Sequence, residues 1–229
     1  MRIIQLSELK QSPQIYKELA EIIAKDGVVC IPAGSTYRLV ANILSKDAVI
    51  KFLQMKRRTK KAPVLVFVAD EDSARQVITN ISAPAQKLID SFWPGDLTLL
   101  FDINQDIPKK IRRNINSSGK IGVRIPDCEV INPLVQAFGG PLFVSSANIS
   151  QKVGSFSEAQ IRKNFGRWVD VLISAGDLPG NRHSTVLDVT TDPPILKRSG
   201  NIKYEDILQI WQSGIIPTTT SPTETQIRS

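Results

Sequence analysis

The chain has 229 residues, 41% of them hydrophobic and 22% charged, which is enough for one large globular domain or two small ones with a sizeable core. Its formal net charge of +7 favours an acidic partner, and nucleic acid or a nucleotide is the commonest such partner. Two cysteines and one histidine exclude a disulfide framework and a histidine-based metal site.

The first part of the chain predicts a helix, a strand and a loop. Ser12 and Pro13 are typical of a helix start, and apolar residues then recur at helical spacing until Gly27. The apolar run 28–31 predicts a strand, and the small and hydroxyl-bearing residues 32–37 predict a loop after it. Ligands usually bind at strand ends in α/β folds, so this loop is a candidate binding segment.

A basic stretch over residues 56–61, KRRTKK, ends the next predicted helix. Pro63 and an apolar run follow it, which predicts a buried strand. Cations gathered at the mouth of a sheet would attract phosphate or another polyanion. The alternative is a solvated helix end whose cations complement the helix dipole. In either case we expect Lys56 to face solvent and to contribute little to stability.

The middle of the chain predicts helices over 73–78 and 84–92, a strand over 97–101 and a turn-rich connection over 107–116. The connection carries a second positive cluster, which either contacts nucleic acid or forms a solvated surface. Its cations are Lys109, Lys110, Arg112 and Arg113.

Two segments in the second half carry polar groups on apolar strands. Arg124 lies in the apolar strand predicted over 121–126, so a carboxylate or a ligand phosphate should face it. The strand that begins at Pro141 runs into a turn with Ser146 and Asn148. These two side chains could bind a ligand, or they could form an ordinary Ser/Asn turn.

The remaining pattern predicts the fold class. Further elements are a helix over 132–138, a helix after a capping box at Ser157, strands over 169–173 and 186–189, and a helix over 204–211. Because strands and helices mix without a strict βαβ rhythm, we expect an α/β fold with a sheet of mixed direction. We expect one domain over residues 1–214 and a disordered tail over 215–229, where Thr, Ser, Pro and Gln dominate.

Five short motifs in order resemble the YrdC/Sua5 family of threonylcarbamoyl-AMP synthases. The motifs are KRR at 56–58 leading to Pro63, WPGDLT at 93–98, GVRIP at 122–126, SSANIS at 145–150 and STVLD at 184–188. Neither a GxxxxGK[ST] loop nor a GxGxxG turn is present, so a nucleotide would be held in a less common way. The resemblance implies the single-domain form, with a twisted mixed sheet, flanking helices and a basic concave face.

The resemblance also assigns candidate site residues. Lys56 and Arg58 match the family's Lys-x-Arg positions and are the candidate catalytic cations. Ser35 and Tyr37 lie in the loop that helps to hold the amino-acid substrate in the family. The candidate nucleotide-binding residues are Thr98, Arg124, Ser146, Asn148, Ser184 and Arg198. No metal ligand is assigned.

One loop departs from the family pattern. The family usually has Pro-Thr-Asp-Thr-Val-Tyr-Gly-Leu where residues 32–39 of this chain read Pro-Ala-Gly-Ser-Thr-Tyr-Arg-Leu. Gly34 replaces an acidic residue and Arg38 replaces a glycine, so the local charge becomes more positive. Arg38 would either point into the cavity and pair with a ligand oxygen or point outward. We expect the outward position, since exposed arginines are common in loops.

The resemblance implies a nucleotidyltransferase, an L-threonylcarbamoyladenylate synthase that makes threonylcarbamoyl-AMP and pyrophosphate from L-threonine, bicarbonate and ATP. The product would serve the N6-threonylcarbamoyladenosine (t6A) modification of tRNA through a separate threonylcarbamoyl transferase, and we expect Mg²⁺ to assist. Two alternatives stay open: a non-catalytic protein that binds tRNA or double-stranded RNA, and a related carbamoyl-adenylate synthase with a different acceptor. We expect a cytoplasmic location and no membrane partner, because the sequence shows neither a secretory leader nor a membrane-length apolar stretch.

Overall fold

The structure is a computed structural model that describes residues 1–57, 63–115, 119–148, 156–180 and 184–213. Two predictions fall outside the described residues: the catalytic role of Arg58 and the tail over 215–229. The domain boundary at residue 214 therefore stays a prediction.

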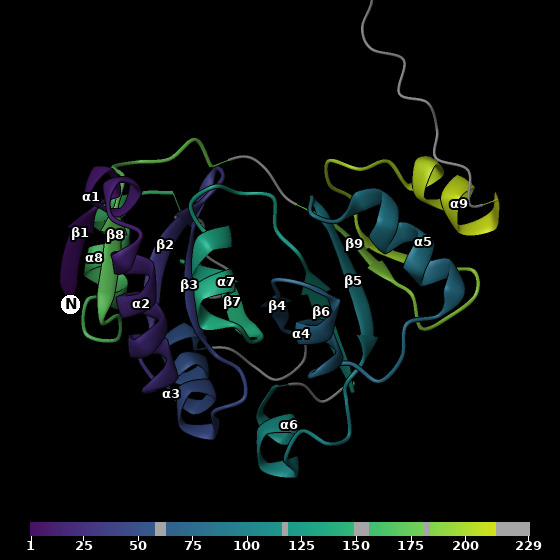
Figure 1. Cartoon of the computed structure of the whole chain (residues 1–229), viewed down its shortest axis with the longest axis horizontal. Coiled ribbons are helices and arrows are strands. Elements are labelled where there is room, and N and C mark those ends of the chain that lie inside the picture. Colours follow the sequence, from purple (N-terminus) through teal and green to yellow (C-terminus); the bar gives the residue numbers. More distant parts are fainter. Residues whose placement is uncertain (58–62, 116–118, 149–155, 181–183, 214–229) are drawn as a thin grey trace, which may run out of the picture.

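Ten strands within the described residues form one sheet in the order β1-β8-β2-β3-β7-β4-β6-β5-β9-β10 (Figure 1). The strands are β1 (Arg2–Gln5), β2 (Val29–Ala33), β3 (Thr36–Asn42), β4 (Leu65–Phe67), β5 (Leu97–Asp102), β6 (Lys120–Arg124), β7 (Leu142–Ser146), β8 (Val171–Ser174), β9 (Thr185–Asp188) and β10 (Ile195–Arg198). Neighbouring strands pair in both directions, for example β2 with β3 antiparallel and β4 with β6 parallel. The expected α/β fold with a sheet of mixed direction is confirmed.

Nine helices in the described part of the chain flank this sheet. They are α1 (Leu6–Gln11), α2 (Gln14–Ala24), α3 (Lys46–Lys56), α4 (Glu71–Arg75), α5 (Ala83–Phe92), α6 (Lys109–Ile115), α7 (Asn132–Phe138), α8 (Glu158–Phe165) and α9 (Tyr204–Ser213). Helices α1, α2 and α7 cover one face of the sheet over β8, β2, β3 and β7 (Figure 1), where Leu19 and Leu134 pack in one apolar cluster with Ile31 and Val144. The other helices contribute to the apolar cluster on the opposite face. Among the described residues, the apolar cluster of the first face does not extend over β6, β5, β9 and β10, and part of the candidate site lies there.

Residues 36–42 form strand β3, although we expected the loop after β2 to continue to Tyr37. The connection is a tight turn around Gly34, whose φ of +67° favours glycine, and Ser35. Strand β3 pairs with β2 on one side and with β7 on the other, and Leu39 and Val40 are fully buried. The loop prediction was wrong because this pairing joins β3 to a strand about a hundred residues later in the chain, which local propensity does not encode.

Three smaller predictions were also wrong. The connection over 107–116 contains helix α6, whose Ile111 and Ile115 are buried four residues apart, as one helical face requires. Ser12 ends α1 and gives no side-chain cap to α2. Ser157 also gives α8 no side-chain cap, and Asp177 accepts a hydrogen bond from the Glu158 N–H instead (2.9 Å).

An aromatic stack fixes α3 against the sheet. The Phe52 ring of α3 lies 4.1 Å from the Phe143 ring of β7, with 24° between the ring planes, and both side chains are fully buried. Such pairs add to the burial of their apolar surface. The stack therefore holds the C-terminal end of α3, at Lys56, close to the end of β7.

We predict that Phe52→Ala lowers the free energy of unfolding by about 3–5 kcal/mol, because it removes a buried ring and leaves a cavity against Phe143. Urea unfolding followed by circular dichroism measures the change. Leu44→Ala is the matched control, since Leu44 is 39% exposed; we expect a change within about 0.5 kcal/mol. Equal losses in the two variants would contradict the role of the stack.

Candidate functional site

Lys56 is buried where α3 ends against the end of β7. Its side chain is 3% exposed, and Nζ donates hydrogen bonds to the Ser146 carbonyl (2.6 Å), to the Asn148 carbonyl and to Asn148 Oδ1 (3.1 Å). Ser146 Oγ also lies 2.6 Å from Asn148 Oδ1, to which it donates. The expectation that Lys56 faces solvent was therefore wrong. The structure brings three of the predicted site residues into one hydrogen-bonded cluster.

Arg124 pairs with a carboxylate, as one of the two alternatives required. Its guanidinium lies 2.5 Å from Asp96 Oδ1 and over the Phe67 ring, 5.7 Å from the centroid. Asn201 donates to the other carboxylate oxygen of Asp96 (2.6 Å). Burial lowers the pKa of Arg124, and the charge of Asp96 opposes this shift. Asp96 was missed as a site residue although it stands inside the WPGDLT motif.

Thr98, Ser184 and Arg198 form a second cluster of predicted residues. The Thr98 and Ser184 hydroxyl oxygens lie 3.0 Å apart within hydrogen-bond distance. Arg198 donates from Nη2 to Ser184 Oγ (3.0 Å), and from Nη2 and Nε to the Ser184 carbonyl (2.9 and 3.1 Å). These contacts tie β10 and β5 to the residue that precedes β9.

Tyr37 anchors the turn between β2 and β3 from the far side of the sheet. It is fully buried, and its hydroxyl lies 2.8 Å from the Gly176 carbonyl and 3.2 Å from Glu158 Oε2. The hydroxyl also accepts a hydrogen bond from the Ala175 N–H (2.9 Å). A role of Tyr37 in substrate binding stays a prediction. Glu158 was missed by the sequence analysis, which assigned this segment only a helix start.

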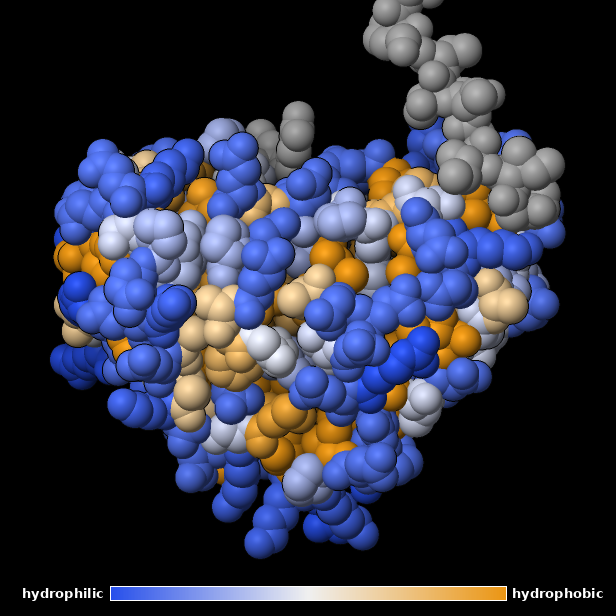
Figure 2. Space-filling model, in the orientation of Figure 1, coloured by the Kyte–Doolittle hydropathy of each residue, from blue (hydrophilic) through white to orange (hydrophobic). Residues whose placement is uncertain are grey.

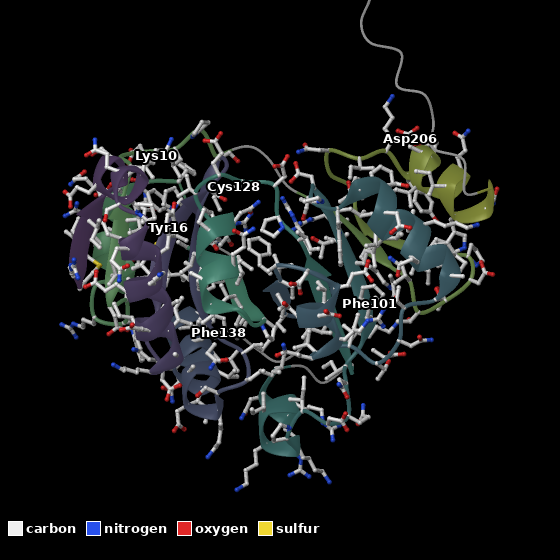
Figure 3. The ribbon with its side chains drawn as sticks, viewed as in Figure 1. Lys10, Tyr16, Phe101, Cys128, Phe138 and Asp206 are labelled. Carbon is white, nitrogen blue, oxygen red and sulfur yellow. The ribbon has the colours of Figure 1, made fainter. Side chains whose placement is uncertain are left out.

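Two hollows lie next to each other at this site. The smaller, which we call the inner cavity, has a volume of about 140 Å³. Its lining includes Ser35, Arg38, Asp96, Arg124, Cys128 and Ser184. Figure 3 labels Cys128 where the chain approaches α7. The larger, which we call the sheet cleft, has a volume of about 590 Å³. Its lining includes Leu65, Thr98, Leu100, Lys120, Gly122, Val186, Asp188 and Arg198.

The predicted residues divide between these hollows. Ser35, Arg124 and Ser184 line the inner cavity, whereas Thr98 and Arg198 line the sheet cleft. Since Arg198 bonds to Ser184, one hydrogen-bonded contact joins the walls of the two hollows. The cluster of Lys56, Ser146 and Asn148 adjoins the inner cavity through strand pairing, because Ser146 faces Arg38 in the register of β3 and β7.

Arg38 points into the inner cavity, so the expected outward position was wrong. It belongs to a strand rather than to a loop, and its Nε is buried without a hydrogen-bond partner among the described residues. Burial, together with the charges of Arg124 and Arg198, lowers the pKa of Arg38 to about 10.

Polar groups at the rim of the sheet cleft form a separate network. Asp188 accepts hydrogen bonds from Lys120 Nζ (2.7 Å) and from Thr190 Oγ1 (2.7 Å), and Lys197 Nζ lies 3.6 Å away. Burial by itself would raise the pKa of Asp188, but the hydrogen bonds from Lys120 and Thr190 outweigh it and lower this pKa. Asp188 is therefore already satisfied by the protein. Within the described ranges, no group of three or more His, Cys, Asp or Glu residues could hold a metal ion.

The comparisons with known proteins agree with this fold. The model of the Sua5/YciO/YrdC family, which carries the description "Telomere recombination", matches residues 21–200. A threonylcarbamoyl-AMP synthase of Pyrococcus abyssi is 29% identical over 191 residues, covering 83% of this chain and 55% of the relative. A putative threonylcarbamoyl-AMP synthase of Methanocaldococcus jannaschii is 29% identical over 210 residues, covering 90% of this chain and 96% of the relative.

A solved structure of P. abyssi Sua5 complexed with L-threonine is similar as well. It is 26% identical with a TM-score of 0.77, and the match covers 93% of this chain and 60% of that one. The chain thus spans little more than half of the length of the P. abyssi relative.

We predict that Lys56→Met lowers the free energy of unfolding by about 1–3 kcal/mol, because the carbonyls of Ser146 and Asn148 lose a buried donor. Lys51→Met on the same helix is the matched control. Lys51 is partly exposed and pairs with Asp170, so we expect a loss below about 1 kcal/mol. Urea unfolding compares the two variants. A Lys56→Met protein as stable as the wild type would contradict the stabilising role of these hydrogen bonds and favour the alternative of a solvated helix end.

The Glu158 network should make stability depend on acidity. Burial alone would raise the pKa of Glu158, but hydrogen bonds from Arg162, Ser174 and the Gly176 N–H outweigh it, so this pKa is lowered. A carboxyl whose pKa is lowered in the folded state stabilises the fold at pH values above its unfolded pKa of about 4.3. This stabilisation is lost as the pH falls through the pKa of the folded state.

We predict that Glu158→Gln lowers the free energy of unfolding at pH 7 by about 1.5–3 kcal/mol, and that the difference from wild type narrows as the pH falls below about 4. Denaturant unfolding at several pH values measures it. Glu18→Gln, which removes a surface pair with Arg2, is the control. A difference that is constant with pH would show that the carboxylate charge plays no part.

Proposed function

Because the chain belongs to the Sua5/YciO/YrdC family, we propose that it is an L-threonylcarbamoyladenylate synthase, which joins L-threonine, bicarbonate and ATP into threonylcarbamoyl-AMP and releases pyrophosphate. The observation that carries the proposal is the pair of adjoining hollows. A small cavity lined by arginines and hydroxyl groups opens beside a cleft about four times larger with apolar residues in its lining.

The two hollows suit the two larger substrates. The sheet cleft has a volume typical of small-molecule sites, and the apolar side chains of Leu65, Leu100 and Val186 offer contact for a nucleoside. The inner cavity has room only for a small polar molecule, and Ser35 and Ser184 can orient it through hydrogen bonds. We therefore propose that the nucleotide occupies the sheet cleft and threonine the inner cavity. This proposal moves Arg124 and Ser184, first taken as nucleotide-binding residues, to the threonine side.

The reaction follows from this placement. The threonine amine attacks the carbon of bicarbonate, water leaves and a carbamate forms. A carbamate oxygen then attacks the α-phosphorus of ATP, and the bond to pyrophosphate breaks. Arg198 stands at the contact between the hollows, where negative charge develops on the phosphates, and a fixed cation there lowers the barrier. Lys56 acts on the same region by holding Ser146 and Asn148, and we propose that Arg58 adds a second cation.

Mg²⁺ would arrive with the nucleotide. The described residues offer no cluster of three ligands, and both oxygens of Asp96 are engaged by Arg124 and Asn201. Mg²⁺ commonly keeps several waters and binds through substrate phosphates rather than through an all-protein cage, which fits this residue set. When bound, it would neutralise phosphate charge, while the protein positions the substrates.

The product would serve the t6A modification of tRNA, with a separate transferase passing the threonylcarbamoyl group onward. We propose a cytoplasmic location to match this role. In the part of the chain that the structure describes, no helix is long and apolar enough to cross a membrane.

A second candidate is a non-catalytic RNA-binding role, and helix α6 is the observation that favours it. The helix protrudes at one edge of the molecule, where hydrophilic side chains cover the surface (Figure 2). Lys109, Lys110 and Arg113 are exposed on it. Binding of tRNA or double-stranded RNA through these cations would weaken steeply with salt. This role can coexist with the enzymatic one.

We predict that the purified protein forms threonylcarbamoyl-AMP, detected by mass spectrometry, only when ATP, L-threonine and bicarbonate are all present.

We predict that Arg198→Gln lowers kcat/KM by about 10²–10³-fold, as expected for a group that stabilises developing charge. Lys203→Gln, an exposed residue outside both hollows, is the control and should keep wild-type activity. Pyrophosphate release that does not need threonine would reject the proposed reaction, and a serine product in preference to threonine would favour the different-acceptor alternative.

A further inference from the structure

Arg38 is a cation for which the protein supplies no partner in the region described. It lines the inner cavity, and neither a hydrogen bond nor an ion pair joins its guanidinium to another described residue. Its Nε is shielded from solvent, so a ligand would reach the guanidinium through the terminal amino groups. Arg38 is partly buried. A charge that is partly withdrawn from water without a partner costs free energy of folding, which a bound anion would offset.

The other arginines at the inner cavity already have hydrogen-bond partners in the described region, although Nε of Arg124 has none. Arg124 pairs with one oxygen of Asp96, and Asn201 donates to the other. Arg198 donates to Ser184. Asp127 also belongs to the lining but is exposed to solvent. Among these arginines, Arg38 is the one whose guanidinium has no hydrogen bond or ion pair with the described residues, which favours it as the contact for an anion in the inner cavity.

The geometry narrows the class of anion. A cavity of about 140 Å³ accepts a small molecule, and the adjoining sheet cleft is the hollow with room for a nucleotide. A planar guanidinium offers parallel donors that match the two oxygens of a carboxylate. Ser35 and Ser184 belong to the same lining, and the Ser184 hydroxyl is held there by Thr98 and Arg198.

We propose that Arg38 binds a carboxylate of the amino-acid substrate in the inner cavity. The inference rests on the proposed function, and it adds a binding residue at a position where the family pattern has glycine, which has no side chain to supply this contact. The carboxylate is either the α-carboxylate, which every amino acid carries, or a side-chain carboxylate of an acidic acceptor.

The test compares Arg38→Met with wild type for three ligands: L-threonine, L-threoninol, in which a hydroxymethyl group replaces the carboxylate, and L-aspartate. Binding is measured by calorimetry with a non-hydrolysable ATP analogue present. We expect wild type to bind its preferred amino acid about tenfold or more tightly than threoninol, and Arg38→Met to lose most of this preference, as for a charge-assisted hydrogen-bonded pair. ATP-analogue affinity should stay unchanged.

Each outcome of the test either supports or overturns the assignment of Arg38. A preference for threonine that Arg38→Met abolishes assigns the α-carboxylate, and a preference for aspartate that it abolishes assigns the side-chain carboxylate. A wild-type protein that does not distinguish threoninol from the amino acids, or a variant that keeps the full preference, overturns the proposal. Arg167→Met, which changes an exposed arginine at the end of α8, is the matched control and should keep the wild-type preference.

A stability measurement separates ligand binding from a structural role. Without ligand, Arg38→Met should unfold at the same temperature as wild type or higher, because a partly buried charge without a described partner is removed. Adding the amino acid with the ATP analogue should raise the melting temperature of wild type more than that of the variant. A structural role predicts a less stable variant instead. The binding experiments do not require product formation. If the wild-type protein forms no adenylate product, the proposed function is rejected, but the assignment of Arg38 as a carboxylate-binding residue still stands.

Discussion

The Lys56 ammonium, buried between the end of α3 and the end of β7, is the contact on which the geometry of the site depends. Three oxygens of Ser146 and Asn148 converge on it, and the stack of Phe52 on Phe143 holds its helix in place. Because strand β7 pairs with both β3 and β4, an atom fixed at its end is fixed relative to both sides of the site. Lys56 therefore acts mainly by holding Ser146 and Asn148 in position, and an electrostatic effect of its charge on the substrate would come in addition.

Uneven coverage of the sheet explains where the hollows lie. In the described part of the chain, helices α1, α2 and α7 cover one face only as far as the central strands. Beyond them, apolar residues such as Leu65 and Leu100 line the sheet cleft. Gly122 leaves space in this floor, since a Cβ there would lie 3.1–3.3 Å from Leu100, Thr98 and the Val64 carbonyl. A cleft with an apolar floor and a charged rim follows from this arrangement rather than from any single motif.

Local patterns in the sequence predicted much of the fold but little of the burial. Helix α7 begins at Asn132 and ends before Gly139, as predicted. Gly139 has a φ of +69°, the left-handed conformation that glycine commonly adopts at the end of a helix. Strand β3 and the inward position of Arg38 could not be predicted, because both depend on pairing with β7, more than a hundred residues away. Helix α6 could have been found from the spacing of Ile111 and Ile115. The family resemblance located Thr98, Arg124, Ser184 and Arg198. It did not mark Asp96 as the partner of Arg124 or Asn201 as a further contact of Asp96, because only the folded chain brings these residues together.

The position of β8 between β1 and β2 has a consequence for how the protein folds. Strand β8, residues 171–174, lies parallel to both of these N-terminal strands, so the order of the sheet cannot be completed until most of the chain has left the ribosome. Contacts of such large sequence separation slow folding, because the loop-closure entropy is lost before the pairing compensates for it. During synthesis, the edge of β2 that later pairs with β8 therefore stays unpaired. A chaperone that shields this edge would protect the nascent chain from aggregation.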